Sequence, residues 1–143
     1  MNGRNRTPFL RLGLVALVAL LALGAASAPA LAQGSTLTID PNGSVGSGVA
    51  TVSGTFTTPP AFAWTRVEVR VVQLRHGQVV VSAFADVGPI AATGSTQNWT
   101  ATMFSPAGFK PGHVQVTARL IRDTFNGPLE LAVAGATVKL NPN

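Results

Sequence analysis

The feature that most constrains this chain is an alternation of apolar and polar residues, which begins near Ser35 and continues almost to the C-terminus. Three stretches carry it clearly, at 49–57, 98–104 and 113–122. Their apolar positions are Ala50, Val52, Gly54 and Phe56, then Trp99, Ala101 and Met103, then Val114, Val116, Ala118 and Leu120. A period of two residues is typical of a β-strand with one buried face, and no long stretch has a helical period. The sequence therefore predicts an all-β domain.

Turn-forming residues divide the alternating stretches into about seven strands. Strands are expected at 35–40, 49–57, 64–75, 78–85, 98–104, 113–122 and 129–140. We expect turns at 40–43 and at His76-Gly77, which would close a hairpin, and a loop at 86–96, with a short strand within it as the alternative. A slip in the alternation at Val71-Val72 predicts a β-bulge. Strands at this spacing, with no helix to connect parallel ones, favour an antiparallel β-sandwich.

The first 32 residues differ from the rest and have the layout of a secretory signal peptide. Three Arg residues precede an uncharged Leu/Ala/Val run at 12–23, and Ala30-Leu31-Ala32 fits a cleavage site. We expect cleavage after Ala32, which leaves the domain 33–143 without a membrane span, secreted to the periplasm or the medium of a bacterium. The alternative is an uncleaved anchor, although the apolar run of about a dozen residues is short for a span of roughly 20.

The composition excludes several kinds of site. The chain has no Cys, which rules out a disulfide framework, a Cys zinc site and a Cys nucleophile. It has no Gly-x-Ser-x-Gly motif, and the glycines at 43–48 are not followed by a helix as a dinucleotide loop requires. Without the leader, seven Lys and Arg face five Asp and Glu, a net charge of +2. We therefore expect no enzyme, no cofactor and no nucleic-acid partner.

Part of the pattern resembles a known family, the bacterial immunoglobulin-like domains of secreted and envelope proteins. The late strands carry the likeness through Trp99-x-Ala101, Pro111-Gly112-x-Val114 and the following Val116-x-Ala118. The early segment Val52-Ser53-Gly54 and the strand after Trp64 are also similar to this family, so the resemblance covers nearly all of 33–143. It implies an immunoglobulin-like sandwich, with fibronectin type III topology as the near alternative. The chain lacks the two core Cys and the corner Tyr of antibody domains.

Aromatic residues fall in two loops that would be neighbours at one end of such a sandwich. Phe62 and Trp64 lie in or after a Pro-containing loop, and Phe125 lies in a later turn next to Arg122. Exposed aromatic rings beside an Arg would suit binding of a protein or a sugar ring. The alternative, which we favour, makes Trp64 the core Trp, because most large aromatic side chains of a small domain are needed inside.

One strand is apolar on both faces, with Val79, Val80, Val81 and Phe84 as its large residues. In the expected fold it lies near a sheet edge, where natural proteins usually place a charge or Pro. An edge of this kind invites a partner strand, from another protein or from a second copy of the chain. The alternative is that the loop that follows covers it.

A metal site is the weakest candidate. The expected topology brings Asp40, His76 and His113 to one end of the domain, and two His with a carboxylate could bind a metal. Their spacing matches no metal motif, and solvent-exposed turn histidines are the simpler interpretation.

These observations favour a secreted or envelope binding domain that is not catalytic, with a protein or a polysaccharide of the cell envelope as partner. The first alternative is a structural subunit of the cell surface, a homo-oligomer that assembles through the apolar edge. The second is a small metal-binding protein. Because this fold carries many functions, the resemblance does not choose among them.

Overall fold

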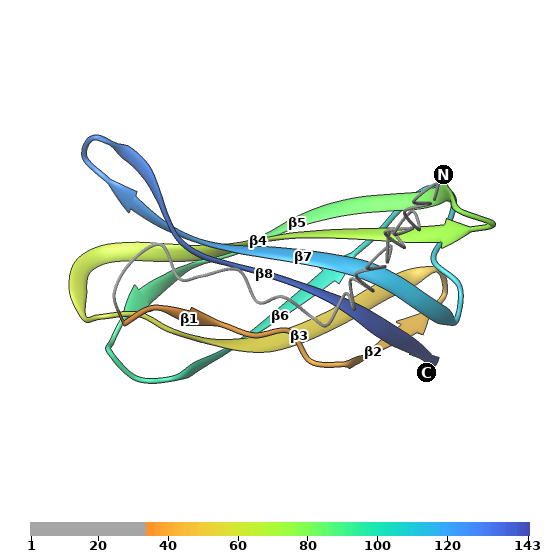
Figure 1. The fold of residues 1–143 in the computed structure, drawn as a ribbon, viewed down its shortest axis with the longest axis horizontal. Helices are drawn as coiled ribbons and strands as arrows, with labels where there is room; N and C mark the ends of the chain where they lie inside the picture. The colour runs from red at the N-terminus through yellow and green to blue at the C-terminus, as the bar shows by residue number, and fades with distance from the viewer. Residues whose placement is uncertain (1–33) are drawn as a thin grey trace, which may run out of the picture.

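The computed structural model describes residues 34–143, which form eight β-strands and, in that range, no helix (Figure 1). The strands are β1 (Thr36–Leu37), β2 (Asn42–Gly46), β3 (Val49–Thr57), β4 (Ala61–Arg75), β5 (Gln78–Ala92), β6 (Gln97–Met103), β7 (Gly112–Thr124) and β8 (Gly127–Pro142). The prediction of an all-β domain is confirmed. The predicted signal peptide, residues 1–32, lies outside the described part of the chain. No helix that could cross a membrane occurs between residues 34 and 143.

The strands lie in two layers, which β2 joins on one side (Figure 1). The hydrogen-bonded order is β1-β3-β2-β8-β7-β4-β5, and β6 pairs with the other edge of β3. One layer therefore holds β3 and β6, and the other holds β8, β7, β4 and β5. Because β2 pairs with both β3 and β8, it closes one side. The opposite side stays open, bordered by β5 and β6.

The core lies between the two layers and is built from the inward positions of the alternating strands. The inward residues predicted for 49–57, 98–104 and 113–122 are all buried, so these three faces are confirmed. The largest side chains with almost no exposed surface are Trp99, Phe56, Phe109 and Met103. Trp99 lies over Gly54 as its cross-strand partner, and its Nε1 donates a hydrogen bond of 3.2 Å to the carbonyl oxygen of Thr38.

The expected turn at 40–43 is wrong, and with it the expectation of a wholly antiparallel fold. After β1 the chain keeps to the edge of β3, because Asp40 N donates to Ser53 O at 2.9 Å. It then passes directly into β2, which runs parallel to β8 and pairs Asn42 with Lys139. Pro41 lies at the crossing, where its carbonyl accepts a hydrogen bond from Lys139 N at 2.9 Å. Pro41 and Gly43 therefore mark the point where the chain begins to pair with β8, and not a reversal of its direction.

The expected loop at 86–96 is also wrong over most of its length. Strand β5 continues to Ala92 because its second half still pairs with β4, with Val87 opposite Val67 and Ile90 opposite Thr65. The ladder shifts register between these two pairs, which accommodates Gly88-Pro89 without ending the strand. The connection to β6 is thus only residues 93–96.

The predicted hairpin is confirmed, but the predicted bulge is misplaced. His76 and Gly77 both have positive φ, 52° and 78°, as a two-residue hairpin turn requires. The alternation of β4 does not slip at Val71-Val72; it continues, with Gln73 buried. The register shift comes two residues later, where Leu74 pairs with Val79 and Gln73 with Val81. Val80 is therefore the extra residue, and the bulge belongs to β5.

Candidate functional site

Strand β5 is the end of the hydrogen-bonded path and pairs only with β4 within the described residues. Its exposed side chains include three large apolar ones, since Val79 is 60% exposed, Phe84 is 63% exposed and Val80 is also exposed, together with the polar Gln78, Ser82 and Asp86. Val81 differs, because it is only 5% exposed and belongs to the core. Three of the four residues that the sequence singled out thus lie at the surface of an open strand edge.

No positive charge lies on β5. Its one charged residue, Asp86, is 3.3 Å from Arg66 Nε on the neighbouring strand, and its one Pro lies farther along, at 89. The stretch from Val79 to Ala85 has no charge and no Pro, two of the features by which natural sheet edges discourage another strand, and of the others it has the bulge at Val80.

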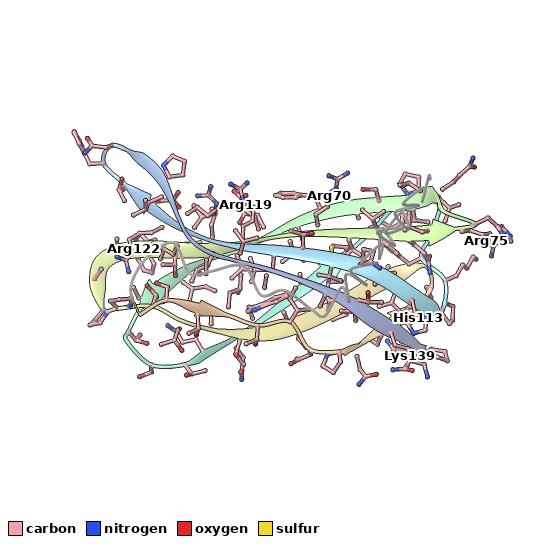
Figure 2. All side chains as sticks on the ribbon, viewed as in Figure 1. Arg70, Arg75, His113, Arg119, Arg122 and Lys139 are labelled. Atoms are coloured by element: carbon pink, nitrogen blue, oxygen red, sulfur yellow. The ribbon has the colours of Figure 1, made fainter. Side chains whose placement is uncertain are left out.

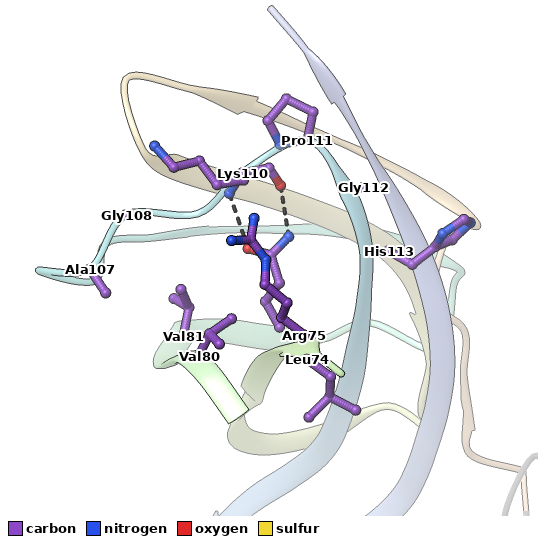
Figure 3. A pocket seen from close by; sticks show the side chains of 11 residues that line it. Leu74, Arg75, Val80, Val81, Ala107, Gly108, Lys110, Pro111, Gly112 and His113 are labelled. Carbon is purple, nitrogen blue, oxygen red and sulfur yellow. Dashed lines mark hydrogen bonds between the residues drawn. The ribbon is translucent and has the colours of Figure 1, made fainter. Parts of the chain in front are cut away.

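A hollow of about 320 Å³ lies beside the first residues of β5 (Figure 3). One wall is apolar and comes from the β4–β5 hairpin, through Leu74, Val80 and Val81. The other side is the connection between β6 and β7, from Ala107 to Pro111. We call this hollow the hairpin pocket. The bulge explains part of its lining, because an extra residue turns Val80 toward the same side as its neighbour Val81.

The connection that forms the far wall of the hairpin pocket is held in place at three points. Phe109 is buried in the core, and its N–H donates to the carbonyl of Gly48 at 2.9 Å. Gln73 Nε2 donates to the carbonyl of Lys110 at 2.8 Å, and the N–H of Lys110 donates back to Gln73 Oε1 at 3.1 Å. Gln73 occupies an inward position of β4 that is otherwise apolar, and its two hydrogen bonds attach this loop to the strand. The pocket wall is preformed.

The hairpin pocket is basic. Arg75 and Lys110 line it, no acidic residue does, and neither cation forms an ion pair within residues 34–143. In Figure 3 the Arg75 side chain extends beside the Gln73–Lys110 hydrogen bonds. His113 also belongs to the lining, but its ring points away from Arg75, beyond β7 (Figure 3).

The acidic residues are concentrated elsewhere, on the outer face of the sheet of β5, β4, β7 and β8. Arg66 contacts Glu68, Asp86 and Asp123 there, and Arg119 bridges Glu68 and Glu130. Hydrogen bonds to Asp123 and then Glu68 raise the pKa of Arg66 above its already high ordinary value. Four of the five acidic residues are thereby used in one network.

The basic residues of the two ends can be compared in Figure 2. Arg75, His113 and Lys139 lie at one end of the molecule, and Arg122 lies toward the other. Together with Lys110, Arg75 and Lys139 give the end that holds the hairpin pocket a positive character without a compensating carboxylate in the pocket lining.

At the other end Trp64 and Phe125 are exposed, as the predicted binding patch requires of them. The favoured interpretation of Trp64 as the core Trp is wrong: Trp64 is 56% exposed, and Trp99, 2% exposed, fills the core. Phe125 is fully exposed at the tip of the β7–β8 hairpin, which projects beyond the layers (Figure 1). The side chain of Phe62 lies outside what the structure describes.

Arg122 has a structural role at this end. Its guanidinium donates to Thr58 Oγ1 at 2.6 Å and to the carbonyl of Pro59 at 2.9 Å. These bonds fasten the β3–β4 connection to β7. The guanidinium that the sequence analysis placed beside exposed aromatics is thus already engaged, and Trp64 lines an open hollow together with three alanines.

The three residues proposed for a metal are not brought together. Asp40 accepts a hydrogen bond of 2.6 Å from Ser53 on β3, His76 lies in the β4–β5 turn, and His113 pairs with Lys139. In the part of the chain that the structure describes, no group of three His, Cys, Asp or Glu is arranged to hold a metal ion.

Sequence reasoning missed the hairpin pocket. Its signal was available as Gln73, a polar residue at an inward position of an otherwise apolar strand. A polar residue at such a position requires a partner, because a buried amide without hydrogen bonds is costly. The partner here is the backbone of Lys110, which lies 37 positions further along the chain.

Comparisons with known proteins give little to set beside this geometry. No protein-family model matches the chain, and no curated protein matches it. Among solved structures the chain has a likeness to Spo0M, a sporulation control protein from Bacillus subtilis, at 10% identity and a TM-score of 0.33. The match covers 76% of this chain and 49% of that chain, so it spans about half of the Spo0M chain. A TM-score this low carries no argument about fold or function.

Proposed function

We propose that this chain is an exported, non-catalytic binding domain that takes an extended segment of a partner protein along the free edge of β5. The observation that carries the proposal is the exposure of Val79, Val80 and Phe84 on a strand that has a neighbour on one side only. Unpaired N–H and C=O groups at a strand edge supply binding energy, and side chains on the same strand supply selectivity.

We assign the fold to the immunoglobulin-like sandwiches. The N-terminal segment supports this assignment, because β1 pairs with β3 in one layer and β2 then pairs in parallel with β8 in the other. A first strand divided between two layers suits the closed side of such a sandwich. The buried Trp99 and the Val-x-Val-x-Ala pattern of β7 are further support.

Export is proposed from the leader-like residues 1–32 and agrees with the absence of Cys, which leaves the core as the source of stability. A protein partner is favoured over a polysaccharide because the exposed feature is a strand edge with aliphatic side chains. Sugar rings are usually bound by aromatic faces with polar groups around them, and the engaged Arg122 weakens that alternative at the other end.

The test uses lysine substitutions at the exposed edge, since a charge there discourages strand addition. Protein expressed from the full sequence is immobilised and screened with a library of random nonapeptides. Peptides recovered on the natural protein should bind V79K and F84K at least about tenfold more weakly. They should bind L129K normally, because Leu129 is a similarly exposed aliphatic residue on β8, away from β5.

Two results would overturn the proposal. The first is a failure to recover any peptide, or equal binding by all four proteins. The second is a stable dimer of the natural protein in sedimentation equilibrium that V79K and F84K abolish. That result would show that the edge of β5 binds a second copy of the chain, and would establish the self-assembling alternative.

A further inference from the structure

We propose that the hairpin pocket captures the C-terminal carboxylate of the peptide that lies along β5, so that the partner is recognised by its free C-terminus. This inference rests on the proposed function, because it assigns a direction and an end to the bound segment. Its evidence is separate, and comes from the position of the pocket, its charge and its preformed wall.

The position of the pocket follows from the direction of β5. The strand starts at Gln78, beside the pocket, and runs away from it toward Ala92. A peptide that adds in the antiparallel sense runs the opposite way, so its last residue arrives at the pocket. Antiparallel pairing is the slightly more stable arrangement, and β5 already pairs in this way with β4.

The charge of the pocket selects the same direction. A parallel peptide would bring an N-terminal ammonium group toward Arg75 and Lys110, which would repel it. An antiparallel peptide brings a carboxylate, which a guanidinium can bind through two parallel N–H groups. Arg75 and Lys110 form no ion pair within the described residues, so a ligand carboxylate does not have to displace a carboxylate of the chain itself.

The shape of the pocket adds a preference for the last side chain. Leu74 and Val80 are partly exposed on the wall next to the cations, and an apolar terminal side chain would cover them. A hollow of about 320 Å³ has room for one such side chain with its carboxylate and not for a long segment. The bulge at Val80 is what widens β5 at this point, and bulges commonly re-aim side chains next to binding sites.

The preformed wall favours binding, because a loop that is already fixed loses little conformational freedom when a ligand arrives. The paired hydrogen bonds between Gln73 and Lys110 and the buried Phe109 hold that loop before any peptide is present. No acidic side chain of the connection between β6 and β7 faces the pocket, since residues 104–111 contain none.

The experiment compares each recovered nonapeptide as a free acid and as its C-terminal amide. Fluorescence anisotropy measures the affinity for protein expressed from the full sequence. Amidation should weaken binding to the natural protein about tenfold or more, the magnitude of a hydrogen bond to a charged group. R75Q and K110Q should reduce that acid-to-amide ratio toward one. K139Q is the matched control, because Lys139 is an exposed cation on β8 outside the pocket lining and should keep the full ratio.

The outcomes separate this inference from the proposed function. Equal affinity for acid and amide on the natural protein, with loss of both on V79K, would overturn carboxylate capture and leave the edge as the binding site. A ratio that persists in R75Q and in K110Q, with unchanged circular dichroism spectra, would also overturn it. Recovery of no peptide would overturn the proposed function and this inference with it. A ratio lost in both variants and kept in K139Q would establish the carboxylate site.

Discussion

Replacement of Gly54 by Ala should strongly destabilise the protein, because the inner face of β3 has no room for a methyl group there. A Cβ on Gly54 would overlap the carbonyl oxygen of Thr38 and lie 2.8 Å from two ring atoms of Trp99. The φ of Gly54 is not positive, so the conflict is one of space and not of backbone conformation. Glycine within a strand often marks such a close approach of another chain segment.

The expected loss follows from what must move. Thr38 is held by its N–H, which donates to Thr55 O at 2.8 Å, by its Oγ1, which accepts from Thr55 N at 3.0 Å, and by its carbonyl, which accepts from Trp99. Relief of the clash displaces Thr38 by more than an ångström and breaks about two of these bonds. At about 1 kcal/mol for each bond and 1 to 3 kcal/mol for overpacking, less up to about 1 kcal/mol gained in the unfolded chain, the net loss is roughly 2 to 5 kcal/mol.

The assay is urea unfolding of the natural protein, G54A and G135A. Gly135 is the matched control, because a Cβ there would meet only the carbonyl oxygen of Val116, at 3.9 Å. G135A should unfold at the same urea concentration as the natural protein or slightly higher, and G54A well below it. If the free energies of unfolding of the two variants differ by less than about 0.5 kcal/mol, the close packing of β1 over Gly54 is refuted.

Three further predictions concern the loops and the leader. Q73L should lower the free energy of unfolding by about 2 kcal/mol, since it removes two hydrogen bonds to Lys110, and hydrogen exchange at the amide of Lys110 should accelerate; an unchanged exchange rate would contradict the clamp. R122M should cost about 1 kcal/mol in urea unfolding, because the bonds to Thr58 and its neighbour are charge-assisted but partly exposed, and a variant as stable as the natural protein would show that they contribute nothing. When the full gene is expressed in an exporting bacterium, mass spectrometry of the secreted protein should find an N-terminus at Gln33, whereas a membrane-bound product that retains Met1 would establish the anchor.

The sequence correctly predicted the strands in which apolar residues that face the core alternate with polar ones. The inward faces of β3, β6 and β7 came out correctly because each strand has one buried and one solvated face, which fixes the side-chain pattern. The His76-Gly77 hairpin was equally predictable, since both of its residues have positive φ and one of them is Gly. Local chemistry decides these features without reference to distant parts of the chain.

The errors have the opposite origin, because each depended on a partner far away in the sequence. Asn42 and Gly43 are typical turn residues, but pairing with β8, nearly 100 residues later, extends them as a strand. Trp64 and Trp99 both begin alternating stretches, and the neighbouring residues do not indicate which of the two side chains is buried in the core. The choice follows from β3, which presents Gly54 opposite Trp99 and so leaves space for an indole ring.

The two strands that border the open side of the molecule, β5 and β6, are not equally protected against strand addition. This difference bears on where a partner would bind. The outward residues of β6 are Asn98, Thr100 and Thr102, and the hydroxyl of Thr102 meets that of Thr51 on β3 at 3.4 Å. Water solvates such an edge well, so β6 offers little gain from another strand. The exposed residues of β5 include the polar Gln78, Ser82 and Asp86, but Val79, Val80 and Phe84 are large and apolar, and water solvates these three poorly.

The charged residues that could discourage strand addition at β5 lie elsewhere in the fold. Four of the chain's five carboxylates lie in the network around Arg66 and Arg119, and Asp86, the one on β5, is bound there as well. Networks of this exposed kind add little to stability, so the need for a stable core does not explain this distribution of charge. The proposed strand addition would explain it, because charges placed between Val79 and Ala85 would exclude an added strand.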